Sequence, residues 1–248
     1  CELIASRHFP DDRQDTFLVN QSIGFHGTRW DRVITEPNVS GLRAERLPED
    51  ILASSDVNFR PVGMEIGPDG TLYIVDWCNP IIGHMQYSVR DPRRDATHGR
   101  IWRIRHAQRP LVDAPVVADA AIPQLLEMLR LPERNTRQIA RRRLQSGDPA
   151  AVLPAVDRWL GEIAARHAMA ADPLHDRLTL EALWIHEAHG VHRADLLDRV
   201  LGLLEPRARA GGVRMIRMRL QDGSIDADEA AVRLERAIAD PDMRVRLE

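Results

Sequence analysis

The sequence predicts a mixed fold in which a β domain is followed by an α domain. Across 59–104 apolar and polar residues alternate with a period of two, which is typical of half-buried strands. From Ala118 onward the apolar residues recur at helical spacing, in a chain rich in Ala, Leu and Arg. Pro110 and Pro115 bracket the change of period. The parts that we expect are a β domain at 1–110, a linker at 111–117 and helical repeats at 118–248.

The clearest strands flank the turn Gly67-Pro68-Asp69-Gly70. Before it, Val62, Met64 and Ile66 alternate with Gly and Glu, and after it 72–75 is rich in β-branched and aromatic residues. A third strand follows a long polar loop, and weaker strand patterns precede all of these. A propeller blade takes about 40 residues and four strands, and a closed ring needs at least four blades. A strand, a Pro68-Asp69-Gly70 turn, a second strand ending in Asp76-Trp77 and a polar loop resemble a blade of a sugar-dehydrogenase-like β-propeller. This resemblance implies the C-terminal part of a β-propeller, and the number of strands predicts about two blades.

The helical part contains a weak repeat. Prolines recur every 33 to 41 residues, and each follows an apolar stretch and precedes an Arg-containing helix start; they are Pro132, Pro173, Pro206 and Pro241. The last segment, ADPDMRVRLE, is similar to the turn between the helices of HEAT repeats. Helix pairs of this kind bury their apolar faces only by stacking on neighbours. We therefore expect an α-solenoid of HEAT- or armadillo-like repeats.

Composition and charge exclude several classes of protein. The net charge is −3, so no global field favours nucleic acid or an anionic membrane. No apolar run approaches the roughly 18 residues of a membrane span. The two cysteines, Cys1 and Cys78, cannot form CxxC or CxxCH, so the chain encodes neither covalent haem attachment nor a cysteine zinc site. We predict no metal site.

The loop from Cys78 to His98 and the residues next to it hold the candidate functional residues, because long ordered loops in compact domains are usually functional. Candidates for a catalytic role are Asp76, His84 and His98, and candidates for binding a cofactor are Arg60, His84, Arg94 and His98. The structural alternative is that Asp76 caps a turn while the Arg and Asp residues around Pro92 pair to hold the loop. In either case we expect Ile81 and Ile82 to anchor the loop by burial, with His84 and His98 close together.

Two further clusters favour structural roles. His186, His189 and His192 do not have the HExxH spacing of a zinc site, so we expect surface or interface histidines. The arginines between Arg134 and Arg143 suggest a phosphate or nucleic-acid site, but charged, solvated faces are common on helical repeats, so we favour a solvated face.

The string FRPV…GPDG.LY.VDW..NPIIGHMQ…RDP.RD..HGR resembles the membrane-bound dehydrogenase family of PVC-type haem-binding proteins, most closely over 56–110. In that family a propeller similar to soluble quinoprotein glucose dehydrogenase, or sorbosone dehydrogenase, precedes helical repeats. A c-type haem domain lies further along the chain. The resemblance implies pyrroloquinoline quinone and calcium in the full propeller, haem c in a separate domain, and export to the periplasm or cell envelope.

Two hypotheses of function follow. In the first, the chain is a segment of an exported sugar- or alcohol-dehydrogenase-like oxidoreductase and is inactive by itself. Its partners are then the remaining blades and the cytochrome c domain of its own polypeptide. In the second, propeller and repeats form a non-catalytic scaffold that binds a protein partner. The initial Cys1 fits either a lipid-bearing mature terminus or, as we favour, a fragment of a longer protein.

Overall fold

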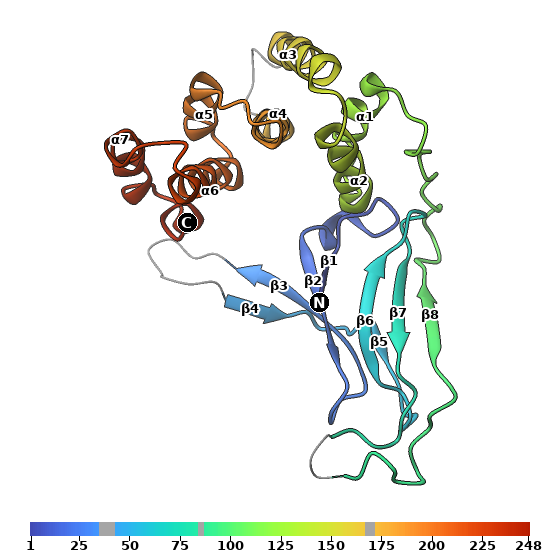
Figure 1. Ribbon diagram of the computed structural model, residues 1–248. Helices are drawn as coiled ribbons and strands as arrows, with labels where there is room; N and C mark the ends of the chain where they lie inside the picture. The colour runs from blue at the N-terminus through green and yellow to red at the C-terminus, as the bar shows by residue number, and fades with distance from the viewer. Residues whose placement is uncertain (35–42, 84–86, 167–171) are drawn as a thin grey trace. The chain divides into compact units, whose positions relative to one another are not determined.

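The computed structural model describes residues 1–34, 43–83, 87–166 and 172–248 (Figure 1). Within these residues the fold combines antiparallel sheets with helices and contains no closed barrel, so the expectation of a β part followed by an α part is confirmed. The chain divides into two compact units. The sheet unit takes in the described residues up to Pro115 together with Pro132–Asn135, and the helical unit takes in Val116–Leu131 and Thr136–Glu248.

Two antiparallel sheets make up the sheet unit. The first has the order β1-β2-β3-β4, with β5 also paired to β3, and the second has the order β6-β7-β8. The strands are β1 (Glu2–Leu3), β2 (Thr16–Gln21), β3 (Gly27–Ile34), β4 (Arg43–Arg46), β5 (Leu52–Ala53), β6 (Pro61–Ile66), β7 (Leu72–Asp76) and β8 (Arg100–Ile104), with a 3-10 turn at Asp11–Arg13.

The expected turn joins β6 to β7. Gly67 N–H donates to the Thr71 carbonyl, and the Asp69 carboxylate accepts from the Thr71 N–H and hydroxyl. Gly70 has φ +82°, and a Cβ there would lie 2.6 Å from Ser6 Oγ, so both backbone and space require glycine. The sequence signal for this hairpin was therefore local and complete.

The core of the sheet unit lies between the two sheets. Its fully buried members are Ile4, Phe9, Leu18, Ile66, Leu72 and Ile74. The alternation in β6 predicted that Val62 would share this face with Ile66, but Val62 is 56% exposed. The register shifts between Pro61 and Gly63, and a β-bulge of this kind turns the side chain that precedes it toward the other face.

Eight helices are described after position 116. They are α1 (Ile122–Met128), α2 (Arg134–Gln145), α3 (Pro149–Arg166), α4 (Pro173–Ala188), α5 (Ala194–Leu201), α6 (Pro206–Asp222), α7 (Ala227–Ile238) and α8 (Met243–Arg246). Pro173 and Pro206 are the first residues of their helices, where a missing N–H costs nothing. Pro132 and Pro241 lie in the connections just before α2 and α8.

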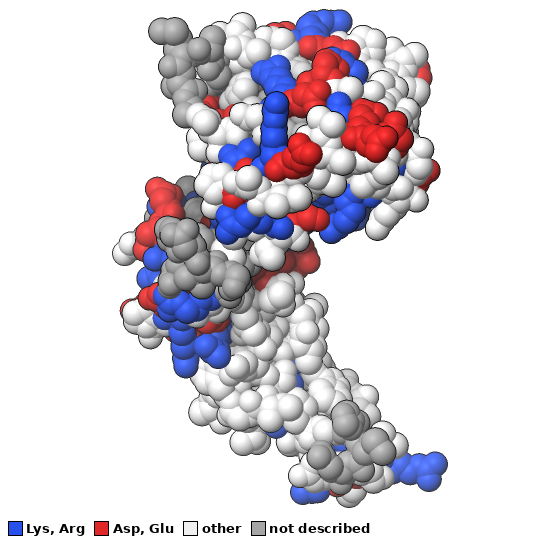
Figure 2. All heavy atoms as spheres, turned by 90° about the vertical axis from the view of Figure 1, so that its left-hand side faces the viewer, with Lys and Arg blue, Asp and Glu red and all other residues white. Residues whose placement is uncertain are grey.

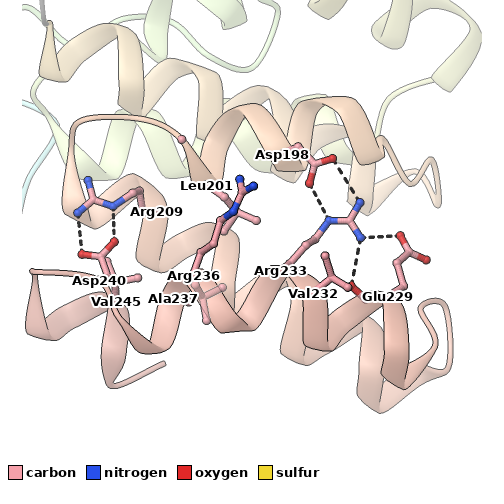
Figure 3. A pocket seen from close by; sticks show the side chains of 12 residues that line it. Asp198, Leu201, Arg209, Glu229, Val232, Arg233, Arg236, Ala237, Asp240 and Val245 are labelled. Atoms are coloured by element: carbon pink, nitrogen blue, oxygen red, sulfur yellow. Dashed lines mark hydrogen bonds and ion pairs between the residues drawn. The ribbon is translucent and has the colours of Figure 1, made fainter.

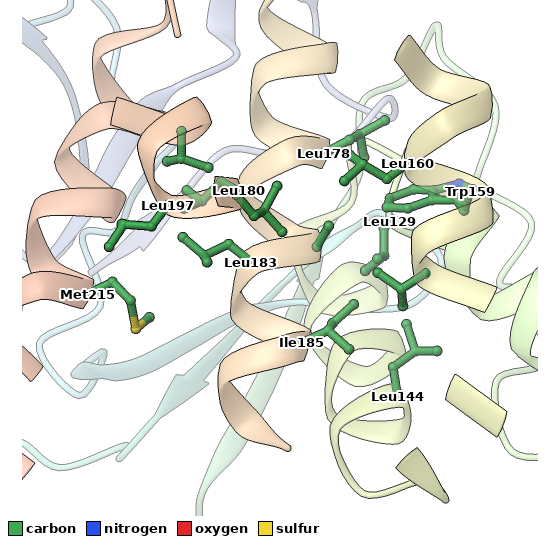
Figure 4. Packing of buried hydrophobic residues seen from close by; sticks show 14 of the residues in the cluster. Leu129, Leu144, Trp159, Leu160, Leu178, Leu180, Leu183, Ile185, Leu197 and Met215 are labelled. Carbon is green, nitrogen blue, oxygen red and sulfur yellow. The ribbon is translucent and has the colours of Figure 1, made fainter. Parts of the chain in front are cut away.

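The helix α4 is the centre of the helical core and is buried on most of its circumference. Figure 4 shows Leu180 and Leu183 directed toward Leu197 and Met215, while Ile185 points the other way, toward Leu144. Close approach of α6 depends on glycine, because a Cβ on Gly211 would lie 2.6 Å from a Leu180 methyl group. Small residues on α6 therefore let it pack tightly against α4.

The repeat in the sequence corresponds to a repeated contact. Arg137 of α2 donates to the Leu131 carbonyl at 2.8 Å, and Arg209 of α6 donates to the Leu203 and Leu204 carbonyls. Arg246 of α8 donates likewise to the Asp240 and Pro241 carbonyls. Carbonyls at a helix C-terminus lack intrahelical partners. An arginine in the following helix satisfies carbonyls of this region after Pro132, Pro206 and Pro241, which explains the arginine at these three places. After Pro173, Arg177 donates instead to the Leu129 and Arg130 carbonyls that follow α1.

Candidate functional site

Asp76 ends β7 and is 1% exposed. The β7–β8 register places Arg100 directly opposite it and Trp102 diagonally across the same face. Oδ2 accepts from Arg100 Nε at 2.6 Å and from Trp102 Nε1 at 3.0 Å. Oδ1 accepts from the N–H groups of Arg60 and Cys78, at 2.8 and 2.9 Å. Both carboxylate oxygens are therefore occupied, and the bond to Cys78 forms the turn cap that we considered as the structural alternative.

Electrostatics agree with this arrangement. Burial by itself raises the pKa of the Asp76 carboxyl, but the hydrogen bonds from Arg60, Trp102, Cys78 and Arg100 outweigh it and hold that pKa below its usual range. Arg100 is also paired with Asp56 at 2.8 Å. Asp76 is thus an ionised acceptor at neutral pH, whereas a general base works best with a pKa near the operating pH.

Arg60 is a buried arginine, 6% exposed, just before β6. Its guanidinium donates to the main-chain carbonyls of Ser22, Asn79 and Pro80. Its Nη1 also lies 2.6 Å from His26 Nε2. These partners come from separate loops and use all three guanidinium nitrogens, so Arg60 holds the loops together.

Arg94 has a similar role in the long loop. It donates to the carbonyls of Ile81, Gly83 and Ser88, at 3.3, 3.1 and 2.9 Å. Ile81 is 7% exposed, which confirms its expected burial.

Ion pairs on the loop involve His98 and the residues around Pro92. Asp91 and Arg93 form the expected pair, at 2.8 Å. His98 is exposed, and its Nδ1 lies 2.7 Å from Asp95 Oδ2. The pKa of Asp95 falls to about 2, chiefly because the Thr97 N–H donates to it, and His98 adds to the effect. His84 lies outside the described residues, so its distance to His98 stays a prediction.

The three histidines near the end of α4 have different surroundings and different hydrogen-bond partners. His186 is buried, with Nδ1 at 2.9 Å from the Ala182 carbonyl, and His189 Nε2 lies 3.0 Å from the Leu144 carbonyl. His192 pairs with Glu187. No group of three or more His, Cys, Asp or Glu side chains suited to a metal occurs in the described ranges.

Basic and acidic side chains are interspersed on the face of the helical unit seen in Figure 2. All 34 basic residues of the chain are arginine. Several form pairs between helices: Arg141 of α2 with Glu181 of α4 at 2.5 Å, and Arg219 of α6 with Glu187 of α4. These pairs are largely buried and join helices that are neighbours in the core. Within the cluster predicted to form a solvated face, Arg141 is therefore structural, whereas Arg134, Arg142 and Arg143 are exposed as predicted. None of the helices in the described part is long and apolar enough to cross a membrane.

Two grooves on the helical unit were not indicated by any sequence pattern. The first, which we call the α5–α7 groove, has a volume of about 570 Å³ and lies among α5, α6, α7 and α8. Figure 3 shows an Arg209–Asp240 pair at one end and Arg233 with Asp198 and Glu229 at the other. The second groove, of about 470 Å³, lies among α2, α4 and α6.

The second groove combines aromatic, sulfur and cationic groups. Arg141 lies over the Trp184 ring at 4.8 Å, and Met218, which is 50% exposed, lines the same groove. Methionine adapts to varied apolar partners. Only the three-dimensional packing of alternate helices brings these residues together, because Arg141 and Met218 are far apart in the sequence.

Residues 2–108 match a family described as "Domain of unknown function (DUF7133)". This range contains all of the described strands, together with Asp76, Arg60, Arg94 and His98. No curated protein and no solved structure matches the chain. The DUF7133 match thus covers the sheet unit's strands and stops before the helices.

Proposed function

We propose that the described chain is a binding and bracing module. In this proposal the helical unit is a set of HEAT-like repeats that binds a segment of a protein partner. The two sheets of the sheet unit are propeller-like blades that support the long loop between β7 and β8. This is the non-catalytic hypothesis that the sequence left open.

One contrast carries the proposal. In the sheet unit, the side chains of Arg60 and Arg94 donate hydrogen bonds to main-chain carbonyls. The Asp76 carboxylate accepts from main-chain N–H groups and from the Arg100 side chain. In the helical unit, grooves of about 570 and 470 Å³ lie open and have apolar as well as charged walls. Ligand sites in proteins are usually concave and mostly apolar with a few placed polar groups. The helical grooves fit that description better than the loop does.

The resemblance of 56–110 supports a second proposal, that the module belongs to an exported, propeller-type sugar or alcohol dehydrogenase that passes electrons to a c-type haem domain. Pyrroloquinoline quinone would need free cationic or imidazole donors, and calcium would need free carboxylates. The described candidates do not fit, since Arg60 and Arg94 face carbonyls and Asp76 accepts four hydrogen bonds. We therefore derive no redox step at these residues.

Selection from a displayed library of random peptides tests the binding proposal. The purified 248-residue chain should enrich a recurring motif, and substitutions in a helical groove should abolish the enrichment while Asp76→Asn should not. A library that shows no enrichment on the folded chain would contradict the proposal.

A further inference from the structure

The α5–α7 groove has an apolar floor between two saturated ion pairs. Val213, Ala237 and Val245 are buried beneath it, and Leu201 of α5 forms part of its wall. The buried positions of α7 are alanines, Ala230 and Ala237, so that helix fills little of the space toward α5. The floor is therefore apolar while the rim is charged, a combination that suits an apolar side chain next to polar groups.

Both ends of the groove are electrostatically complete. Arg209 binds both oxygens of Asp240, at 2.7 and 2.8 Å, and its remaining donor serves two carbonyls. Arg233 is held by Asp198 at 2.7 Å and by Glu229 at 2.7 Å. In each arginine all three nitrogens have an acceptor and the charge is paired, so neither guanidinium needs a ligand as a partner.

Arg236 lies between these two pairs and is different. It is exposed and has no hydrogen bond or ion pair within the part of the chain that the structure describes. Figure 3 shows its guanidinium between Arg209 and Arg233 with no partner drawn. A guanidinium favours a carboxylate that it can bind with two parallel hydrogen bonds.

From this geometry we infer that the α5–α7 groove binds an extended peptide whose apolar side chain occupies the floor while an Asp or Glu nearby binds Arg236. This inference rests on the proposed function and specifies the partner. A phosphate or nucleic acid fits poorly, because one free cation stands among the carboxylates of Asp198, Glu229 and Asp240. A single carboxylate matches the single free guanidinium, and the rims of paired charges suit a polar peptide backbone on both sides of the anchor.

The test uses the full 248-residue chain and a displayed library of random 12-residue peptides. Three proteins are compared: the unmodified chain, Arg236→Met, and Arg143→Met, which removes an exposed arginine of α2 outside both grooves. The unmodified chain and Arg143→Met should enrich peptides with Asp or Glu within two positions of a large apolar residue. Arg236→Met should lose the requirement for the acid.

Affinities of an enriched peptide then measure the contact. Changing its acid to the amide should weaken binding to the unmodified chain about tenfold, the expected worth of a hydrogen-bonded charge pair, and should not change binding to Arg236→Met. Arg236→Glu should prefer a peptide with Lys in place of the acid.

Three outcomes would overturn the inference. If the preference for an acidic residue survives Arg236→Met, or if the enriched motifs lack an acidic residue, the assignment of the α5–α7 groove as the peptide site is wrong, while the proposed function stands. If decanoate binds in an Arg236-dependent way and no peptide is enriched, the occupant is a free apolar acid. If nothing is enriched on any of the three folded proteins and decanoate does not bind, both the inference and the proposed function fail.

Discussion

Asp76→Asn is the substitution that most directly separates a bracing role from a catalytic one. The amide keeps one oxygen, which can still accept from the Arg60 and Cys78 N–H groups. Its NH2 group then faces Arg100 Nε and Trp102 Nε1, which are donors. Two donors therefore lose their acceptor, and the charge of Arg100 loses its buried partner.

The expected cost follows from these contacts. Breaking a buried ion pair costs about 3–5 kcal/mol, and a buried unsatisfied donor costs about 1–3 kcal/mol. Arg100 is 32% exposed at its side chain and keeps Asp56, which lowers the penalty. We expect a loss of about 3 kcal/mol in the free energy of unfolding of the sheet unit, or a fall of roughly 10 °C in its Tm.

The effect should also depend on pH. Because the pKa of Asp76 is lowered in the folded protein, its stabilisation is present above the unfolded pKa of about 3.9 and is lost as pH falls through the folded value. The stability difference between the unmodified chain and Asp76→Asn should therefore be largest near neutral pH and shrink below about pH 4.

Urea unfolding followed by tryptophan fluorescence, with circular dichroism to report the helices separately, measures both effects. Asp91→Asn is the matched control, since it changes a carboxylate on the same loop whose partner, Arg93, is exposed, and it should lower the unfolding midpoint much less than Asp76→Asn does. If Asp76→Asn unfolds at the same urea concentration as the unmodified chain, the network does not stabilise the unit. Asp76 would then be available for chemistry, and our assignment of it would be wrong.

Three further changes test other parts of the structure. Gly27→Ala should destabilise the sheet unit by about 1–3 kcal/mol in urea unfolding, because a Cβ would overlap the Leu52 carbonyl. Gly161→Ala is the control and should be neutral or stabilising, since no atom lies within 4 Å of the added Cβ. Equal effects of the two substitutions would refute the steric argument. Arg219→Met should cost about 3–5 kcal/mol in thermal unfolding by leaving Glu187 buried and poorly paired, and a neutral result would mean that the pair adds nothing. With added pyrroloquinoline quinone and calcium, the chain should show no sugar- or alcohol-dependent dye reduction, and turnover above a denatured control would contradict this.

The parts of the fold that sequence predicted are those with local causes. The change of period near Pro115, the turn at Gly70 and the prolines that begin α4 and α6 all act within a few residues. The prediction that Val62 is buried was wrong because a β-bulge arises from the pairing of two strands. The alternation within one strand does not reveal it. The finer architecture, propeller blades and HEAT repeats, stays a proposal because it depends on how such units assemble.

The candidate site was harder to predict because its partners are distant in sequence. The sequence analysis named Asp76 as a candidate, but its partners Arg100 and Trp102 meet it only through the register of β7 and β8. Aligning the two strands so that Asp76 faces Arg100 would have paired an acidic with a basic side chain, so the sequence did contain a signal for this contact. The α5–α7 groove had no such signal, since Arg236 is one of many arginines until the packing of α5 on α6 is known.

Arg236 differs from other arginines of the helical unit, which have structural partners. Arg137, Arg209 and Arg246 satisfy carbonyls at helix ends, and Arg219 pairs with a buried carboxylate. A lysine could not replace these contacts, because a single ammonium lacks the planar fork that reaches two acceptors at once. A structural need therefore accounts for the arginine-rich composition at these positions. It does not account for Arg236, which lies in the α5–α7 groove between the Arg209 and Arg233 ion pairs. Among the residues that the structure describes, no hydrogen-bond acceptor contacts its guanidinium. A ligand carboxylate is the partner that its position leaves room for.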